Sequence, residues 1–339
     1  MAGKVYSICS TPAVLDLTEP CSDSHRIVPA FGWHPWFSHH LFDETKYGSV
    51  SSLTSEQKQT HYESVLTPKP DDLAFLHSLP DPRPLGDLVQ HSRYHLSRYP
   101  LALVGEVGLD KSCRVPYTWR SEQKPDRDNS LTPGGREGRT LTPYRVSMDH
   151  QRKVLLAQLR LAGETKRAVS LHGVAAHGVL YETLAETWRG YERHVPSKRE
   201  RLREKAALKA KAGPQQVEDH VATEAGPMPY PPRVCLHSFS GPPETVKQYT
   251  APTIPCEIYF SFSTTINTWT EGSDGKVEAA VRAVPHDRLL VESDLHIAGD
   301  RMDGYLEAVV REICKVKGWE LEDGVIRLGE NWKRFISGQ

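Results

Sequence analysis

The sequence predicts an α/β fold, a TIM-type (β/α) barrel, on the strength of three observations. Short and nearly continuous apolar runs recur along the chain, which is the pattern of strands buried on both faces. Segments with helical periodicity lie between several of these runs, which favours right-handed βαβ units and a parallel sheet. Four of the runs end in a residue able to bind a divalent metal ion. Ligands that converge from several strand ends are typical of a barrel built around a metal site.

Seven apolar runs are predicted to be strands. They cover residues 4–10, 26–34, 101–108, 167–173, 233–239, 257–263 and 288–294. A closed barrel of this kind has eight strands, so the count predicts a barrel that lacks one strand. With 339 residues the chain is long enough for one such barrel, and we expect a single domain over residues 1–339.

Helices are predicted between and after these strands. Apolar residues of segment 147–164 recur at helical spacing and should form one buried face. They are Val154, Leu155, Leu159 and Ala162. Segments 277–285 and 303–318 show the same periodicity, and the second of them ends at a glycine suited to a helix cap.

Three segments interrupt the alternation of strand and helix. Residues 38–95 are expected to be poor in helix until the stretch LGDLVQHSRYHL, which reads as one helix. Residues 113–146 are rich in Pro, Gly, Arg and polar groups and are predicted to be a flexible insertion. Residues 192–232 form a second, charged and Pro-rich insertion. The two later insertions each follow a strand that carries a possible ligand, so we expect them to emerge near the catalytic face.

The charge balance limits how the chain could bind nucleic acid. Lys and Arg number 42 against 43 Asp and Glu, so no overall positive field draws in a polyanion. Any such binding must come from a local patch, and the basic run 193–213 is one that could follow a phosphate backbone. The simpler interpretation, which we favour, is a solvated helix stabilised by Glu200 and Glu204.

The cysteines and the N-terminus point to an intracellular protein. Six cysteines are scattered without a CxxC pair, which suits reduced thiols better than a disulfide framework. Cys235 and Cys256 lie in apolar runs and are predicted to be core residues. The first residues lack the apolar stretch of a signal peptide, and no later run has membrane-spanning length. We therefore expect a cytoplasmic or nuclear protein.

The four possible ligands stand at the ends of LALVGE, AVSLH, RVCLH and LLVESD. They are Glu106, His172, His237 and Asp294. Glu106 lies between two glycines that let other groups approach closely, and His177 follows His172 in the same motif. Each has an ordinary alternative, namely a surface Glu, a hydrogen-bonded His or an Asp that caps a helix. Together, acid, His, His and acid make a mixed nitrogen and oxygen set suited to Zn, Mn or Mg.

Hydrolysis is the chemistry that such a set supports. A bound dication lowers the pKa of its water from about 15.7 toward 7 and polarises a phosphoryl or carbonyl oxygen. A second metal ion about 3.5–4 Å away would stabilise both the attacking and the leaving oxygen of a phosphodiester.

The motifs GEVGLD, LHSFSG, LLVESD and FGWHP (31–35) resemble the successive motifs of the TatD family. These are metal-dependent deoxyribonucleases of the amidohydrolase-like TIM-barrel group. GENWKRF (329–335) resembles the closing helix of that family, so the resemblance covers most of the chain outside the insertions. The insertions, with FGWHPW and SLHGVAAHG, resemble the fungal branch, some members of which are described as interacting with a TPR subunit of the anaphase-promoting complex.

The resemblance implies roles for particular residues. Glu106 would bridge two metal ions, His172 and His237 would complete one site, and Asp294 would serve the other, with Glu106 and Asp294 as catalytic residues. His34 in FGWHP would lie at the rim of the pocket, as a substrate contact or as a group behind the ligands.

Three aromatic residues lie next to His34 in the same stretch. They are Trp33, Trp36 and Phe37. Their rings would either stack on nucleobases or seal the barrel mouth, and the sequence leaves both open.

One departure from the family concerns the start of the barrel. The family opens with a strand that bears His-x-His and completes the metal site of Asp294. This chain begins at what resembles the second strand, and the triplet 23–25 (DSH) is only a superficial substitute. The site of Glu106, His172 and His237 would then survive, while edges stay unpaired on the flanking strands. An incomplete gene product and a loss of full nuclease activity both remain open.

Two functions follow from this reading. The first is a metal-dependent hydrolase that cleaves DNA phosphodiester bonds with metal-activated water and Mg, Mn or Zn as cofactor, expected to be an exonuclease. The alternative is a catalytically impaired TatD-like scaffold that binds a protein partner such as a TPR subunit of the anaphase-promoting complex. No membrane partner is predicted.

Overall fold

The computed structural model describes most of the chain. The described residues are 4–9, 27–48, 50–119, 136–203, 228–264, 266–267, 275–295 and 299–338. The triplet 23–25, residues 204–213 of the basic run and the centres of both later insertions lie outside them. Among the described residues, no helix combines the length and the apolar character needed to cross a membrane.

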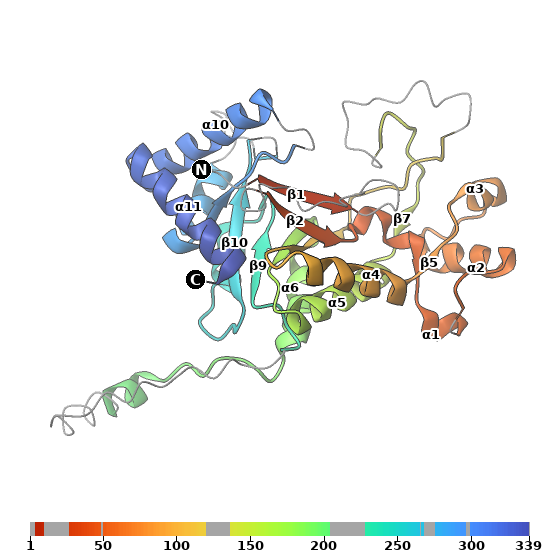
Figure 1. The fold of residues 1–339 in the computed structure, drawn as a ribbon, viewed down its shortest axis with the longest axis horizontal. Helices are drawn as coiled ribbons and strands as arrows, with labels where there is room; N and C mark the ends of the chain where they lie inside the picture. The colour runs from red at the N-terminus through yellow and green to blue at the C-terminus, as the bar shows by residue number, and fades with distance from the viewer. Residues whose placement is uncertain are drawn as a thin grey trace.

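A seven-stranded sheet runs through the centre of the molecule, and its strands follow one another in chain order (Figure 1). They are β1 (Lys4–Cys9), β2 (Ile27–Gly32), β6 (Leu103–Asp110), β8 (Val169–Val174), β9 (Arg233–Leu236), β10 (Glu257–Phe262) and β11 (Leu289–Val291). All neighbouring strands pair in parallel. The seven predicted strands are thus confirmed, and the winding is that of the predicted TIM-type barrel. Within the described residues, the pairing runs from β1 to β11 without a bond between those two strands.

Helices make the crossovers between consecutive strands, as parallel pairing requires. They are α4 (Leu85–Arg98), α5 (Met148–Glu164), α6 (His177–Trp188), α8 (Pro243–Tyr249) and α9 (Lys276–Ala283), followed after β11 by α10 (Asp300–Lys317) and α11 (Leu321–Ser337). The predicted helices at 147–164, 277–285 and 303–318 are confirmed. The predicted glycine cap is also confirmed, because Gly318 ends α10 in the left-handed conformation with a φ of 66°.

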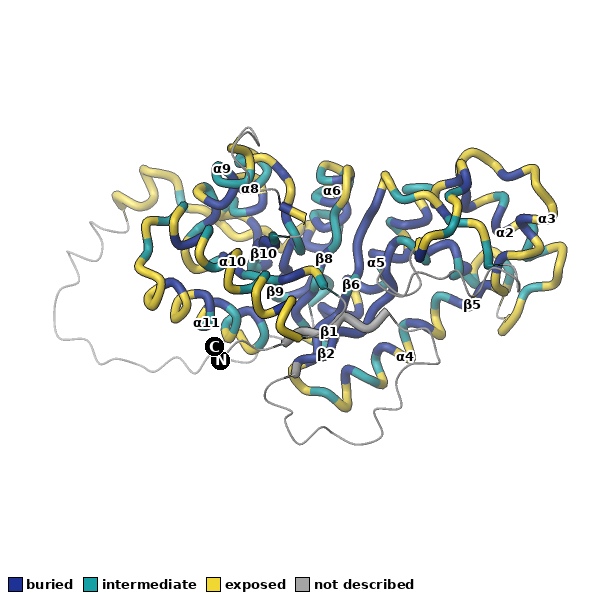
Figure 2. The backbone as a smooth tube through the Cα atoms, turned by 90° about the horizontal axis from the view of Figure 1, so that it is seen from above, coloured by how far each residue is buried: buried dark blue, intermediate teal, exposed yellow. Residues whose placement is uncertain are grey.

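The core lies between the sheet and its crossover helices, where Figure 2 shows the buried segments gathered around the strands. The four residues predicted to form the inner face of α5 are each at most 2% exposed. Cys235 and Cys256 are 5% and 4% exposed, which confirms them as core residues. The described part of the chain therefore packs its strands on apolar helix faces, as the sequence periodicity predicts.

Residues 41–84 and the ends of the first insertion build a lobe beside the carboxyl ends of β2 and β6. Its elements are β3 (Leu41–Phe42), α1 (Glu44–Tyr47), α2 (Ser55–Val65), β4 (Leu66–Thr67), α3 (Leu73–Ser78), β5 (Arg83–Pro84) and β7 (Arg145–Val146). The helix predicted at LGDLVQHSRYHL is confirmed as α4, but the expectation of little helix before it is wrong. Helix α2 is set by local hydrogen bonds, because Thr54 and Gln57 form a capping box at its start.

The described ends of the insertion 113–146 pair with each other and join the core of the lobe. Pro116 and Leu141 form an antiparallel bridge. Val115 and Tyr144 are 4% and 7% exposed and pack with residues of α2 and α3. The described ends of the insertion are thus fixed to the lobe, and the lobe lies beside the carboxyl ends of β2 and β6.

Candidate metal centre

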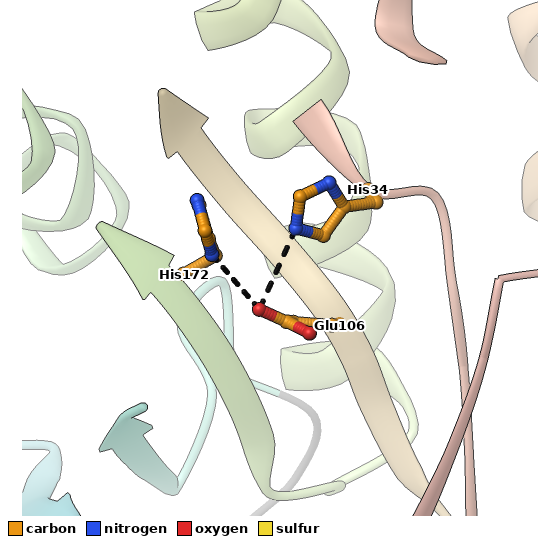
Figure 3. Close-up of side chains that lie close together, drawn as sticks. All are labelled: His34, Glu106 and His172. Atoms are coloured by element: carbon orange, nitrogen blue, oxygen red, sulfur yellow. Dashed lines mark hydrogen bonds and ion pairs between the residues drawn. The ribbon is translucent and has the colours of Figure 1, made fainter. Parts of the chain in front are cut away.

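The four predicted ligands and His34 come together at the carboxyl ends of the strands. Glu106 Oε1 lies 2.9 Å from His172 Nδ1, 3.6 Å from His237 Nε2 and 3.5 Å from His34 Nε2. His237 Nε2 lies 3.0 Å from Asp294 Oδ1. In Figure 3, the neighbouring rings of His34 and His172 both point at one oxygen of the Glu106 carboxylate. The convergence that the strand-end pattern predicts is therefore present.

Two glycines let the strands of this site approach closely. A Cβ atom on Gly105 would lie 2.8 Å from the Cβ of Ser170, and one on Gly108 would overlap the carbonyl oxygen of His172. The close approach predicted around Glu106 is thus confirmed. Glycine at 105 and 108 holds β6 against β8 and so brings Glu106 within reach of His172.

Two of the side chains leave their strands through left-handed backbone positions. Ser238, directly after His237, has a φ of 40°, and Asp294 has a φ of 54°. Non-glycine residues adopt this region rarely, and it is often found at functional sites. These turns end β9 and β11 abruptly and keep His237 and Asp294 at the carboxyl edge of the sheet.

Two further carboxylates stand behind the histidines, and the sequence analysis did not assign them. Asp110 Oδ2 lies 3.3 Å from His172 Nε2, and Glu292 Oε2 lies 2.5 Å from His237 Nδ1. Strand periodicity could have found Asp110, because residues an even number of positions apart on a strand share a face and Asp110 follows Glu106 on β6. Glu292 follows the last residue of β11, and its only signal is that it is the other acid of LLVESD.

The donor set creates a strongly negative site. Burial opposes the charge of Glu106, but the histidines at 237 and 34 and a hydrogen bond from His172 hold its pKa well below the usual value. Burial also opposes a charge on His172, yet hydrogen bonds to Asp110 and Glu106 raise its pKa to about 9. Glu292 and Glu106 raise the pKa of His237 well above 6.5 in spite of its burial. The carboxylates thus keep His172 and His237 protonated. A site that stabilises positive charge in this way suits a divalent cation.

His34 differs from the other two histidines in both charge and tautomer. Burial lowers its pKa, so the ring is neutral at neutral pH. Its Nδ1 accepts a hydrogen bond from the backbone N–H of Trp36 at 3.2 Å, at the start of the 3-10 helix η1 (Pro35–His40). The proton of the neutral ring is therefore on Nε2, the atom that faces Glu106.

The tautomers decide which nitrogens fit a metal ion. Ligand atoms of His34, Glu106 and His172 lie within 4.8 Å of one another, which makes this trio the most compact donor group of the described residues. His34 Nε2 carries its hydrogen, however, and is a donor in this arrangement. His172 and His237 each meet a carboxylate at both ring nitrogens, so a metal ion beside Glu106 would replace the hydrogen on His172 Nδ1 and on His237 Nε2, while the other hydrogen stays directed at Asp110 or Glu292. With Glu106 and Asp294, these two imidazoles form a mixed nitrogen and oxygen donor set of the kind that suits a divalent ion.

The aromatic residues beside His34 have separate roles. Trp33 is 9% exposed and packs with Leu41, Leu88 and Val154, so it closes the core below the site. The indole N–H of Trp36 donates to Asp110 Oδ2 at 2.8 Å. Its ring lies edge-on to His34, with 4.6 Å between centroids. Trp33 is thus buried in the core and is not available to stack on a nucleobase, whereas Trp36 lies at the site itself.

His177, the second histidine of SLHGVAAHG, lies apart from this cluster. It is the first residue of α6, and its ring lies 5.6 Å from that of Phe239. Burial lowers its pKa. His177 is partly buried and packs against Phe239, so its contacts are structural.

Comparison with known proteins gives a consistent picture. A family model described as TatD related DNase matches residues 4–337. The chain is 38% identical over 311 residues to Cut9-interacting protein scn1 of Schizosaccharomyces pombe, a match that covers 92% of this chain and 84% of that protein. It is 25% identical over 328 residues to an uncharacterized deoxyribonuclease of Saccharomyces cerevisiae, with 93% and 83% covered.

A solved structure resembles the fold along the whole chain. The TatD homolog YJJV of Escherichia coli has a TM-score of 0.50 and 14% sequence identity, and the match covers 100% of this chain and 87% of that chain. At this identity the likeness concerns the fold alone, and it agrees with the TIM-type barrel.

Proposed function

The chain belongs to the TatD-related DNase family, and from this premise we propose that it is a metal-dependent hydrolase that cleaves phosphodiester bonds of DNA, as an exonuclease. One observation carries the proposal. Two imidazoles and two carboxylates from separate strands converge at the carboxyl edge of the sheet, with His172 and His237 both turned toward Glu106. This is a nitrogen and oxygen donor set of the kind found in metallohydrolases.

The side chains at the site divide the work. Glu106, His172, His237 and Asp294 would hold the divalent ion or ions, Mg, Mn or Zn. A bound ion would supply activation of water and polarisation of a phosphoryl oxygen. His34 presents a neutral Nε2–H at the same place, which suits a hydrogen bond to an anionic phosphoryl oxygen of the substrate.

Exposed cations beside the strand ends support a polyanionic substrate. Lys111 and Arg114 follow Asp110 directly, and Arg136 and Arg145 lie on the returning arm of the same insertion. Such cations contact phosphates without reading sequence. They lie in the segment that leaves β6 at the site, and they are the candidates for the local positive patch that DNA binding by an almost neutral chain would need.

Glu106→Gln tests the enzyme. The neutral amide keeps the size of the side chain but removes the charge that the ligand histidines face, so we expect loss of both bound metal and DNA cleavage. Elemental analysis measures the bound metal. Digestion of end-labelled DNA with added Mn²⁺ or Mg²⁺ measures the cleavage. Lys333→Ala, on the exposed face of α11, is the control. Cleavage at the wild-type rate by Glu106→Gln would refute the assignment.

A second candidate function is a scaffold that binds a TPR protein. The relative with 38% identity is named Cut9-interacting protein, and this match covers 92% of the chain. Purified chain should then bind purified Cut9 in calorimetry, and Glu106→Gln should bind equally well because the site is not needed for docking. Absence of binding by both proteins would refute the scaffold and leave the hydrolase untouched.

A further inference from the structure

We propose that Asp110 and Glu292 are positioning residues that fix which ring nitrogen of His172 and His237 is offered to the metal ion. The inference rests on the metal-dependent function proposed above and deepens it. Asp110 and Glu292 would keep the imidazoles of His172 and His237 in the tautomer that can bind a metal ion. His34, in the same cluster, has a backbone N–H in the corresponding place and adopts a different tautomer.

Glu292 is held in place by hydrogen-bond donors on both of its oxygens. Its Oε1 accepts hydrogen bonds from the backbone N–H of Ser238 at 2.5 Å, from the Ser238 hydroxyl at 2.8 Å and from the Ser261 hydroxyl at 2.9 Å. Its Oε2 lies 2.5 Å from His237 Nδ1. A carboxylate can only accept, so Nδ1 must carry a hydrogen. The hydrogen that a bound metal ion would displace from His237 is then the one on Nε2, the atom that faces the other proposed ligands Asp294 and Glu106.

Asp110 repeats this arrangement on the other side of the site. Its Oδ1 accepts from the N–H and hydroxyl of Ser112, both at 2.7 Å, and from the N–H of Cys113 at 2.9 Å. Its Oδ2 faces Trp36 Nε1 at 2.8 Å and His172 Nε2 at 3.3 Å. His172 would therefore keep its hydrogen on Nε2 when a metal ion displaces the one on Nδ1, the nitrogen that faces the proposed ligand Glu106.

The two histidines would use different ring nitrogens for the same purpose. His172 would offer Nδ1 and His237 would offer Nε2, because the other nitrogen of each ring donates to a carboxylate that positions it. Metal-ligating histidines usually have such a partner, whose removal costs about 10–100-fold in metal affinity. His34 has a backbone N–H in that place, which leaves its hydrogen on the side facing Glu106.

Trp36 links Asp110 to the 3-10 helix η1. Its indole N–H and the ring of His172 share one oxygen of Asp110. Trp36 belongs to η1, which starts directly after His34. The same short helix therefore carries the proposed substrate donor and supports a ligand histidine.

Glu292→Gln inverts one tautomer with little change in shape. The amide oxygen of the substituted side chain would have to stay on the three donors of Ser238 and Ser261, so its NH₂ group would face His237 Nδ1. That nitrogen must then accept, which places the hydrogen on Nε2 and blocks the binding lone pair.

Asp110→Asn does the same to His172 but also sets its NH₂ against the Trp36 N–H. The double variant Asp110→Asn with Trp36→Phe removes that conflict and keeps the inverted tautomer. Glu200→Gln is the matched control, an exposed carboxylate 3.9 Å from His194 and outside the site.

Zn²⁺ titration by calorimetry and ¹⁵N NMR of the labelled histidines in the Zn²⁺-loaded protein test the proposal. We expect about 10–100-fold weaker Zn²⁺ binding for Glu292→Gln and for the double variant, and no weakening for the control. In wild type, His172 should be bound through Nδ1 and His237 through Nε2. Equal Zn²⁺ affinity of the variants, or the opposite tautomers in wild type, would overturn this proposal alone. A wild-type protein that binds no Zn²⁺, Mn²⁺ or Mg²⁺ would overturn the proposed hydrolase as well.

Discussion

One oxygen atom, Oε1 of Glu106, is the point at which three imidazole rings meet. His172, His237 and His34 all reach it within 3.6 Å. The strand-end pattern predicts this meeting because the carboxyl ends of parallel strands share one edge of a sheet. It does not predict the tautomers, since these depend on a backbone N–H of Trp36 and on carboxylates that reach across from other positions.

Metal binding should release protons and weaken as the pH falls. The pKa of His172 is raised to about 9 and that of His237 lies well above 6.5, so both rings hold an extra proton at neutral pH. A metal ion must displace these protons before it can use the nitrogens. Calorimetry with Zn²⁺ in buffers of different ionisation enthalpy gives the number released. Affinity independent of pH, with no proton release, would contradict the assignment.

The same raised pKa values affect the stability of the metal-free protein with a defined sign. A histidine whose pKa is higher in the folded state stabilises that state fully below its unfolded pKa of 6.5. The contribution of His172 is then lost as the pH rises through about 9.

Among the elements, the strands and crossover helices were predictable and the lobe was not. Strands such as β6 and β10 are continuous apolar runs, and α5 shows its stripe, so their signals are local. Helix α2 buries only His61, Tyr62 and Val65, near its end, and its start is set by the hydrogen bonds of Thr54. Asp110 and Glu292 were missed for a related reason, because the histidines that they contact come from other strands, far away in the sequence.

Helix η1 should be sensitive to acid through the histidines packed beneath it. His61 Nε2 donates to the carbonyl of His39 at 2.8 Å and His150 Nε2 to that of Ser38 at 2.8 Å, so both rings hold the helix backbone. Burial lowers the pKa of His61 and of His40 to about 4. The folded state disfavours protonation of these buried rings more than the unfolded state does. The free energy of unfolding of the lobe should therefore decrease as the pH falls from about 6.5 toward about 4.

His61→Gln tests this sensitivity, since the amide can donate to the same carbonyl without titrating. We expect its acid-unfolding midpoint, followed by tryptophan fluorescence, to lie at lower pH than that of wild type. The exposed His77→Gln serves as control because it removes a histidine from α3 at the surface. An unchanged or higher midpoint for His61→Gln would contradict the argument.

Helix α11 should stabilise the strand that carries Asp294. Asn331 is 1% exposed and donates to the carbonyl oxygens of His286 and Leu289 at 2.8 and 2.9 Å, at the entrance of β11. Asn331→Ala leaves buried polar groups without partners and should cost about 1–3 kcal/mol in urea unfolding. Lys333→Ala on the exposed face of α11 should cost little. A smaller effect of Asn331→Ala than of Lys333→Ala would refute this role.

At the scale of the whole molecule, the chain is almost neutral, but four exposed cations lie on the segment that follows β6. If Arg114 and Arg145 contact phosphates, replacing both with Gln should weaken DNA binding and lower the salt dependence, by about one in the log–log slope for each lost contact. Fluorescence anisotropy with labelled DNA in EDTA measures this without cleavage. Arg311→Gln, which removes a cation paired with Glu307 on α10, should leave the slope unchanged. Equal slopes for all three proteins would refute the phosphate contacts.

The order of the strands in the sheet has a consequence for how the protein is made. Each strand from β1 to β11 pairs with the one that precedes it in the sheet and in the chain. The sheet can therefore grow in step with the ribosome, because every new strand finds its neighbour already synthesised. The donors arrive in the same sequence, from His34 through Glu106, His172 and His237 to Asp294. The proposed metal centre would therefore be complete only near the end of translation, after most of the barrel has been made.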